Sequence, residues 1–446
     1  MTRVLLVTGL GGAGRTTVAA ATAVAEARAG RRTLFLAADG TADADTVLGL
    51  KLGLDPVEAE PRLYAARVAV REEFEREFLL VQEQLGGILA LFGVDPLDPE
   101  EITAVPGAVD ALALRVLARY VLAGGDGRVA DDSAAGAEPA SSDGAAAGEP
   151  VTADGPAPAD GPTAFDLVVV DLPPAEQAVL ALALPETLAR YLDRLLPVER
   201  QAARGLAPIL AVAAGVPMPD EWLYATARRV IAELDAIRAV LDGPRTTVRF
   251  VTRPGTVAAA ADRRAASALA LYGRTVGDVV VNGLAEGGAL ARDRTAALRG
   301  LFPGAEMVAV AGGGDEPLGA DALAGFAEIL PPLTALPPVP APPDEDGREA
   351  VPADPAPPVF GDASGDGFDV EADGDRLVLV VPLPGAERGE LDLLRRGDEL
   401  IVTVGAYRRM LPLPSALRRC TIEGAGLRGG VLRVRFVPDP AVWMRR

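Results

Sequence analysis

A glycine-rich stretch near the N-terminus holds residues whose types and spacing could do chemistry. Residues 9–17 read Gly-Leu-Gly-Gly-Ala-Gly-Arg-Thr-Thr, between a predicted strand at 3–8 and a predicted helix that begins near Thr17. Glycines let successive backbone N–H groups curl around a phosphate, and the helix N-terminus adds its dipole. Thr16 stands where a hydroxyl would hold Mg²⁺. The spacing predicts a phosphate-binding loop made of Gly9, Gly11, Gly12, Gly14, Arg15, Thr16 and Thr17.

Arg15 occupies the position at which phosphate-binding loops carry a lysine. A guanidinium is a planar fork and a lysine ammonium is a point charge, so the exchange is not conservative. The whole chain prefers arginine, because Lys51 is the only lysine among 43 Lys and Arg residues. Two interpretations stay open at this point. The loop either binds nucleotide with weak hydrolysis, or it keeps the turn and no longer binds nucleotide.

Composition excludes several other chemistries. The 446 residues contain no histidine, which rules out a Ser-His-Asp triad, a Cys-His pair and a His-ligated zinc. The single cysteine, Cys420, rules out an intramolecular disulfide, a CxxC zinc clip and a metalloid site built from several thiolates. A formal net charge of −20 argues against nucleic acid or an anionic membrane as the main partner.

The elements that must position the loop alternate between short apolar strands and amphipathic helices. Uninterrupted runs such as Leu167–Val170 are typical of a sheet that is buried on both faces. The alternation predicts an α/β domain with a doubly wound, mostly parallel sheet over residues 1–335. Its clearest strands are Arg3–Thr8, Thr33–Ala37, Asp166–Asp171, Thr247–Thr252, Asp278–Asn282 and Met307–Ala311.

Two segments have the composition of unfolded chain. Residues 124–164 carry eight acids against Arg128 and no aromatic residue, which predicts a disordered insertion. Residues 336–367 carry seven acids against Arg348 and are rich in proline, which predicts an extended linker between domains. Residues 368–438 show short strands, Gly and Pro turns and no convincing helix, so we expect an all-β domain there.

The sequence gives no sign of export or membrane insertion. The apolar run at residues 4–7 has the length of one strand and breaks at the glycine cluster, unlike a signal peptide. No stretch reaches the roughly 18 uninterrupted apolar residues that a spanning helix needs. We therefore predict a cytoplasmic protein without an integral membrane segment.

In these residues the chain resembles the family of arsenical-pump ATPases and tail-anchored-protein targeting ATPases. These are deviant-Walker P-loop proteins whose loop reads GKGGVGKT. The five positions 9, 11, 12, 14 and 16 match, whereas Leu10 and Arg15 replace the two lysines. In the family the first lysine reaches across a dimer interface to the partner's phosphates, and Leu10 cannot supply that charge.

The resemblance continues through the two switch segments. The family's first switch reads DPAHxLxD and its second DTAPTGHT. Asp39 matches the residue that orients the attacking water, and Asp171 matches the carboxylate that organises Mg²⁺ and water. Pro174 also matches, while Gln177 replaces the histidine. The resemblance implies catalytic roles for Asp39 and Asp171 and metal ligation by Thr16 and Asp171. Alternatively, acids at strand ends simply cap the following turn.

Later segments extend the match in order. Residues 279–282 read Val-Val-Val-Asn, and Asn282 matches the residue that contacts adenine in the family. Thr252-Arg253-Pro254 resembles the family's TxPE segment, and residues 316–319 resemble the loop that closes over the base. The resemblance implies ATP and Mg²⁺ as cofactors and a homodimer. The family's dimer, which is held by a zinc clip, is excluded by the cysteine count. Dimerisation by direct packing stays open.

The C-terminal residues resemble the α-crystallin domain of small heat-shock proteins. The matches are the Leu383-Pro384-Gly385 turn after a strand, the strand at 409–412 that ends in Leu-Pro, and an ending that reads A-x-x-x-x-G-V-L from Ala425. An immunoglobulin-like sandwich that serves only as a structural module is the alternative.

A predicted amphipathic helix at 72–92 places Phe74, Phe78 and other apolar residues at spacings of three and four. Core packing is the common reason for such a face, and in the targeting ATPases helices of this region form a groove for a client helix. We therefore predict an ATP-binding protein that handles hydrophobic protein segments in a nucleotide-dependent way, with weak hydrolysis. The alternative is a scaffold or chaperone-like protein that does not hydrolyse ATP.

Overall fold

The structure is a computed structural model. Three predictions fall largely outside its described residues, namely the insertion at 124–164, the helix at 72–92 and the linker at 336–367, and the domain boundaries set by that linker stay predictions too. The described residues are 2–68, 107–122, 164–195, 221–284, 289–312, 314–333, 368–374 and 376–439, with the isolated positions 75, 78, 79, 82 and 98.

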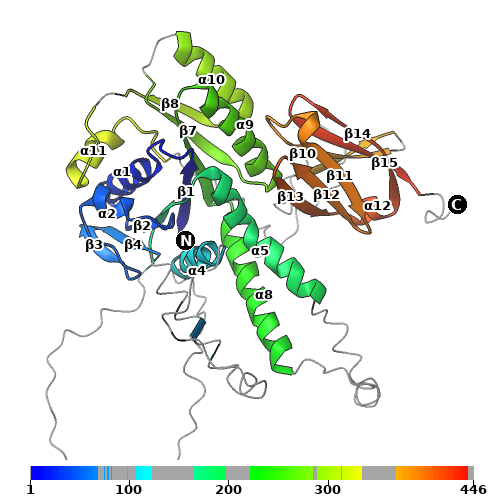
Figure 1. Cartoon of the computed structure of the whole chain (residues 1–446), viewed down its shortest axis with the longest axis horizontal. Coiled ribbons are helices and arrows are strands. Elements are labelled where there is room, and N and C mark those ends of the chain that lie inside the picture. The colour runs from blue at the N-terminus through cyan, green and yellow to red at the C-terminus, as the bar shows by residue number, and fades with distance from the viewer. Residues whose placement is uncertain are drawn as a thin grey trace, which may run out of the picture.

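An eight-stranded sheet forms the centre of the N-terminal domain (Figure 1). Its order is β3-β4-β2-β5-β1-β6-β7-β8, and every neighbouring pair is parallel except β3 and β4. The predicted parallel sheet is confirmed, and the six predicted strands are present with bounds that differ by two residues at most. The strands are β1 (Arg3–Gly9), β2 (Thr33–Ala37), β3 (Val57–Glu60), β4 (Leu63–Arg67), β5 (Leu167–Asp171), β6 (Thr246–Thr252), β7 (Val276–Asn282) and β8 (Glu306–Val310).

Helices cover both faces of this sheet. The helices are α1 (Arg15–Arg28), α2 (Asp43–Leu48), α4 (Ala108–Leu122), α5 (Ala175–Leu195), α8 (Glu221–Leu241), α9 (Thr256–Leu271), α10 (Ala289–Leu301) and α11 (Ala320–Ala327). Alternate residues of a strand point to opposite faces, so Leu5 and Val7 pack with α1 and α2, while Val4 and Leu6 pack with α4, α5 and α8. Because both faces are covered, the strands read as continuous apolar runs.

The hairpin of β3 and β4 was not predicted. Three of the four residues of β3 read Glu-Ala-Glu, and the strand lies at the edge of the sheet with its first two residues exposed. An edge strand that carries charges gives no apolar run to recognise in the sequence.

The C-terminal domain is a sandwich of two antiparallel sheets, ordered β14-β15-β10-β9 and β11-β12-β13. Along β12 half-buried and buried residues alternate, as expected for a sheet with one face in the core. The predicted all-β domain is confirmed, with a strand β9 and two short helices that the sequence did not predict. Its elements are β9 (Asp369–Asp373), β10 (Arg376–Pro382), η4 (Arg388–Glu390), β11 (Leu391–Arg396), β12 (Glu399–Val404), β13 (Tyr407–Pro412), α12 (Ser415–Arg418), β14 (Cys420–Arg428) and β15 (Val431–Pro438).

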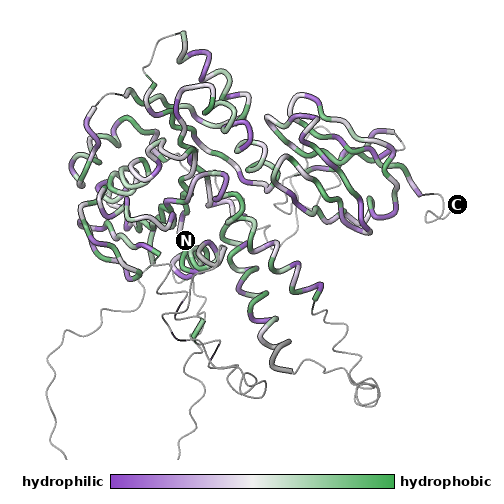
Figure 2. Tube along the Cα trace, viewed as in Figure 1, coloured by the Kyte–Doolittle hydropathy of each residue, from purple (hydrophilic) through white to green (hydrophobic). Residues whose placement is uncertain are grey.

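The sandwich lies beside α9 and α5, on the side of the sheet away from α1, α2 and α11 (Figure 1). Residues of α5, α9, β6 and β7 and the inner residues of the sandwich belong to one continuous apolar cluster. Figure 2 shows hydrophobic residues along α5 and α8, which pack against each other. The two domains are therefore joined by side-chain packing as well as by the chain.

Candidate functional site

The glycine-rich loop connects β1 to α1 and is pressed against the neighbouring strands. A Cβ on Gly9 would lie 1.9 Å from the carbonyl oxygen of Val251 in β6, so no side chain fits there. A Cβ on Gly14, whose φ is +86°, would lie 2.7 Å from Nδ2 of Asn282. Close approach thus demands glycine at both ends of the loop, while the predicted loop residues Gly11 and Gly12 are exposed between them.

The N-terminus of α1 has no side-chain cap. Gly14 is the N-cap, no side chain caps the helix, and its first turn contains no acidic residue. Arg15, Thr16 and Thr17 form this turn and are half-buried. Backbone N–H groups at such a helix start have no partner inside the helix, and together with the dipole they attract an anion. The local geometry therefore suits a phosphate group.

Asp171 ends β5 next to this loop. In the sheet it lies level with Val7 of β1 and with Ala37 of β2. The residue is completely buried, and neither carboxylate oxygen has a hydrogen-bond partner among the described residues. The pKa of this carboxyl is raised to about 7, mainly by burial and also by the negative charge of Asp39. The Thr16 hydroxyl and Arg15 lower it in part, although the hydroxyl does not reach hydrogen-bonding geometry.

An unpaired buried carboxylate beside a hydroxyl fits Mg²⁺. This cation prefers oxygen ligands, usually takes one or two carboxylates from the protein, and keeps water and phosphate oxygens at its remaining positions. Within the described part of the chain, no group of three or more Asp, Glu or Cys side chains is arranged to hold a metal ion. Asp171 and Thr16 are the residues that could contact the ion.

Asp39 follows β2 and performs the turn-capping role that the sequence left open. Its carboxylate accepts a hydrogen bond from the Thr41 backbone N–H at 3.0 Å and one from the Thr41 hydroxyl at 2.8 Å. Its charge nevertheless acts on Asp171, and Asp43 in the first turn of α2 does so more weakly. The structure therefore brings Asp39 to the predicted site while using its oxygens in the turn.

Arg15 of the loop and Thr8 of β1 bind residues 171–178, which we call the second switch segment. Arg15 Nη1 donates to the carbonyl oxygen of Leu172, and the Thr8 hydroxyl donates to the carbonyl oxygen of Pro173 at 2.8 Å. No local sequence pattern indicates the first of these bonds, because it joins residues 157 positions apart. Leu10 is half-buried and packs against the apolar clusters on both faces of the sheet. Position 10 thus contributes to the core of this chain.

Asn282 ends β7 and lies at the far side of the loop. Its side-chain Nδ2 donates to the carbonyl oxygen of Ala13 at 2.9 Å. The sequence placed Asn282 among the cofactor-binding residues, and the structure brings it to the loop, at the position where a Cβ on Gly14 would collide. Its amide group supports the loop conformation in this arrangement.

A buried polar network lies at the end of β6 and was not predicted from the sequence. Asp262 of α9 accepts a hydrogen bond from the Thr252 hydroxyl at 2.8 Å and pairs with Arg294 of α10. Arg294 also donates to the carbonyl oxygen of Arg253 at 3.1 Å. Burial raises the pKa of Asp262, and its two partners oppose that rise. The network fixes α9 and α10 to the carboxyl end of the sheet.

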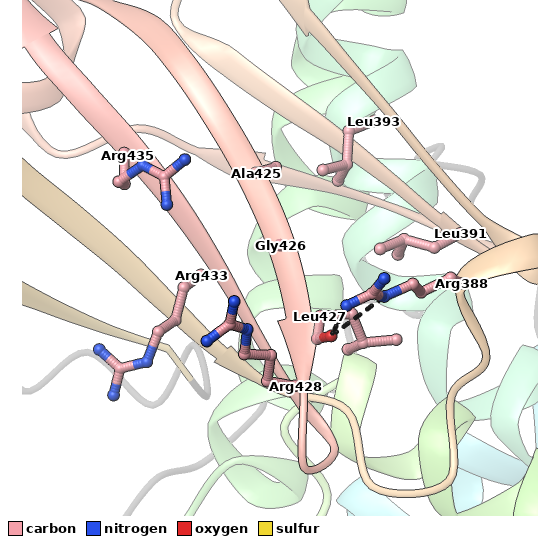
Figure 3. A pocket seen from close by; sticks show the side chains of 9 residues that line it. All are labelled: Arg388, Leu391, Leu393, Ala425, Gly426, Leu427, Arg428, Arg433 and Arg435. Atoms are coloured by element: carbon pink, nitrogen blue, oxygen red, sulfur yellow. Dashed lines mark hydrogen bonds between the residues drawn. The ribbon is translucent and has the colours of Figure 1, made fainter.

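A cavity of about 650 Å³ lies in the sandwich, between β11 and β14 (Figure 3). Arg388, Arg428, Arg433 and Arg435 line it together with Leu391, Leu393, Ala425, Gly426 and Leu427. Arg388 donates to the carbonyl oxygen of Leu427, at 3.4 Å from both Nε and Nη2. All its lining residues belong to the C-terminal domain, so the cavity is not part of the loop site.

A strand, a glycine loop and a helix at the centre of a mostly parallel sheet, with a buried carboxylate ending the next strand, define the class of P-loop nucleoside triphosphatases. The family model for the anion-transporting ATPase matches residues 2–134 and 160–289, and the model for the HSP20-like domain found in the same family matches residues 374–436. The chain belongs to the anion-transporting ATPase family and carries its HSP20-like domain, which confirms both resemblances.

Relatives match over nearly the whole length. The chain is 41% identical to an uncharacterized protein of Streptomyces coelicolor, over 99% of both chains. It is 30% identical to a protein of Mycobacterium tuberculosis, over 99% of this chain and 97% of that one. It is 25% identical to the putative arsenical pump-driving ATPase of Chlorobaculum tepidum, over 93% of this chain and 91% of that one. None of the helices in the described ranges is long and apolar enough to cross a membrane.

Proposed function

We propose that the chain binds ATP together with Mg²⁺ at the loop between β1 and α1. The observation that carries this proposal is the buried, unpartnered carboxylate of Asp171 beside an uncapped helix N-terminus. Leaving a buried carboxylate without a partner is costly, so a site that does so is expected to gain from a cation. Membership of an ATPase family supports ATP as the nucleotide.

In this proposal, the loop glycines and residues 15–17 hold the phosphates, Asn282 contacts the base, and Thr16 and Asp171 contact the metal ion. Bound Mg²⁺ would neutralise charge on the transferring phosphoryl group. Asp39 orients the attacking water. Hydrolysis is expected to be slow, because Leu10 supplies no charge and removing a cation from such a site lowers the rate by orders of magnitude.

The second candidate is a protein that binds partners through both domains without hydrolysing ATP. Two observations favour it. Leu10 is packed into the apolar clusters, and the guanidinium of Arg15 is bonded to the Leu172 carbonyl oxygen. The two positions that carry lysines in the family, 10 and 15, thus serve contacts inside the protein. Such contacts favour a loop that is kept for its shape rather than for nucleotide binding.

Calorimetric titration with Mg-ATP, combined with a phosphate-release assay, separates the candidates. We expect the wild-type protein to bind at micromolar to millimolar nucleotide, and Arg15→Ala and Asp171→Asn to bind more weakly. Arg433→Ala, a change in the other domain, serves as the control and should bind like wild type. Absence of binding at millimolar nucleotide refutes the ATP proposal, and binding without phosphate release selects the protein without turnover.

Nucleotide-dependent handling of hydrophobic protein segments, by a dimer that forms through direct packing, is part of the same proposal. One face of α5 supports it, since Leu180, Leu188, Tyr191 and Leu195 are 51%, 37%, 48% and 75% exposed at helical spacing. Capture of apolar helical peptides should fall for a Leu188→Asp/Leu195→Asp variant, and sedimentation should show the dimer. Unchanged capture by a folded variant refutes this part.

A further inference from the structure

Three consecutive residues of α9 reach three different parts of the molecule. Asp262 holds Thr252 at the end of β6, as described above. Arg263 reaches the C-terminal domain, and Arg264 reaches the first turn of α5. We call residues 262–264 the α9 junction. Because successive helix positions are separated by about 100°, a rigid helix fixes these three directions relative to one another.

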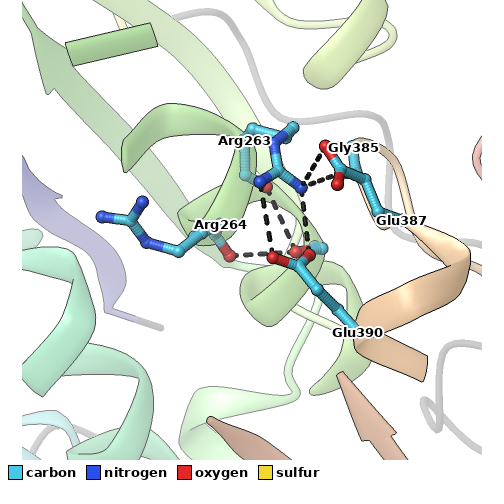
Figure 4. A network of polar contacts seen from close by, with 6 residues as sticks. Arg263, Arg264, Gly385, Glu387 and Glu390 are labelled. Carbon is cyan, nitrogen blue, oxygen red and sulfur yellow. Dashed lines mark hydrogen bonds and ion pairs between the residues drawn. The ribbon is translucent and has the colours of Figure 1, made fainter. Parts of the chain in front are cut away.

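Arg263 binds the C-terminal domain at the turn after β10 (Figure 4). Its Nη1 donates to the carbonyl oxygen of Gly385 at 3.0 Å, pairs with Glu390 at 3.0 Å and lies 3.2 Å from Glu387. A Cβ on Gly385 would lie 2.7 Å from Cγ of Arg263 and 2.8 Å from Cδ2 of Leu301, and the φ of Gly385 is +80°. The turn is thus fitted to α9 without space for a side chain.

Arg264 connects the junction to the second switch segment. Its Nη2 lies 3.1 Å from a carboxylate oxygen of Glu176, in the first turn of α5. Glu176 follows Asp171 by five residues, and Ala175 and Val179 of the same helix start belong to the apolar cluster that continues into the sandwich. Movement of the segment that carries Asp171 would therefore reach α9 and the C-terminal domain.

The later turns of α5 bind the same domain. Arg190 forms two hydrogen bonds to Glu399 of β12, at 2.9 and 2.8 Å. Glu186 pairs with Arg409 of β13 at 3.2 Å, and Arg409 also donates to the carbonyl oxygen of Leu271 at 2.9 Å. The side chain of Arg409 is only 5% exposed. Ion pairs between a guanidinium and a carboxylate fix the orientation of the two domains, while the shared apolar cluster supplies most of the stabilisation.

We propose that docking of the C-terminal domain on α5 and α9 is coupled to occupancy of the loop site, each stabilising the other. The domain holds the start of α5 and the α9 junction in the one arrangement that presents the Asp171 carboxylate to a cation. When the domain is undocked, both helices are free to shift. Part of the free energy of nucleotide binding is then used to order the site. Linkage makes the effect reciprocal, so nucleotide should tighten docking by the factor by which docking tightens nucleotide binding.

This inference rests on the proposed nucleotide binding, and the test uses the full chain. Glu390→Arg reverses the charge that faces Arg263, at a residue outside the loop site. Glu371→Arg is the matched control, because it breaks the ion pair with Arg433 inside the same domain at 2.7 Å. Gly385→Val opens the interface sterically, and the double variant Glu390→Arg/Arg263→Glu restores an ion pair.

Two quantities are measured on each protein, namely the affinity for Mg-ADP by calorimetry and the hydrogen exchange of α9 and of residues 383–386. We expect Glu390→Arg and Gly385→Val to raise exchange at the interface and to weaken Mg-ADP binding roughly tenfold, within the usual range of coupling between sites. The control should match wild type, and the double variant should regain most of the affinity. In wild type, Mg-ADP should slow exchange at residues 383–386.

Equal Mg-ADP affinity in wild type and in both interface variants, with exchange showing that the interface has opened, overturns the coupling and leaves the proposed function standing. Absence of nucleotide binding by the wild-type protein, for Mg-ATP as well as Mg-ADP, overturns the proposed function, and the coupling with it. The two failures are distinguished by the wild-type titration alone.

Discussion

Two buried carboxylates of the central sheet, Asp171 on β5 and Asp278 on β7, differ in what faces them. Asp278 accepts hydrogen bonds from the fully buried Arg249, at 2.6 Å from Nε and 3.1 Å from Nη2. Neither carboxylate oxygen of Asp171 accepts a hydrogen bond in the described part of the chain, and the nearby Thr16 hydroxyl and Arg15 act on its pKa only in part. Burial raises the pKa of both carboxyls, and only in Asp278 is an arginine bonded to the carboxylate to oppose it.

The difference separates a carboxylate that holds the fold together from one that is available for a ligand. Arg249 also donates to the Thr22 hydroxyl of α1 and to the carbonyl oxygen of Pro331, both at 2.8 Å, so the pair joins two strands, a helix and the segment after α11. Asp171 makes no such connection. A buried charge that stabilises nothing in the protein itself is a reasonable marker of a functional site.

The largest expected effect is on the paired carboxylate. Asp278→Ala leaves the Arg249 guanidinium buried with its charge uncompensated, so we expect the free energy of unfolding to fall by about 3–5 kcal/mol. Urea denaturation followed by circular dichroism measures the change. A double variant, Arg249→Met/Asp278→Ala, should recover most of the loss, because replacing a buried pair by apolar groups is often close to neutral. If the double variant is as unstable as the single one, packing rather than charge explains the effect.

The unpaired carboxylate should show itself in the pH dependence of stability. The pKa of Asp171 is about 7 in the folded protein, above its value of 3.8 in an unfolded chain. The folded state therefore binds the extra proton between these values, and stability falls as pH rises from about 4 to about 7, then stays level with respect to this group. Asp171→Asn should remove that slope, with a difference on the order of a few kcal/mol at pH 8.

Urea titrations of both proteins at a series of pH values, at constant ionic strength and without divalent cations, measure this slope. Adding Mg-ATP to the wild-type protein should reduce the stability lost at pH 8, because a bound cation compensates the ionised carboxylate. Parallel stability curves for wild type and Asp171→Asn would show that the Asp171 carboxylate is not unpaired. The contrast with Asp278 would then be wrong as well.

The sequence predicted the position of each carboxylate better than its environment. Continuous apolar runs predicted a sheet covered on both faces, and the carboxyl ends of its strands bring Asp39, Asp171 and Asn282 to the glycine loop. Side-chain pairing was not predictable. Arg249 and Asp278 are 29 positions apart and appear in the sequence only as charges inside apolar strands. The bond from Arg15 to Leu172 likewise depends on strand order, which no local pattern encodes.

A smaller effect on stability is expected in the polar network at the end of β6. The carboxylate of this network is intermediate between the unpaired Asp171 and the paired Asp278. Asp262 is completely buried and paired with Arg294, and it also accepts a hydrogen bond from the Thr252 hydroxyl. Thr252→Val keeps the shape of the side chain and removes one donor from a carboxylate that retains its arginine. We therefore expect a loss of about 1–3 kcal/mol in the free energy of unfolding, at or below the loss for Asp278→Ala.

Thr421→Val, at an exposed position of β14, is the control and should change stability by less than about 0.5 kcal/mol. If Thr252→Val loses as much stability as Asp278→Ala, the Thr252 hydroxyl and not Arg294 compensates the buried charge of Asp262. Pairing with a cation would then no longer distinguish the structural carboxylates from Asp171.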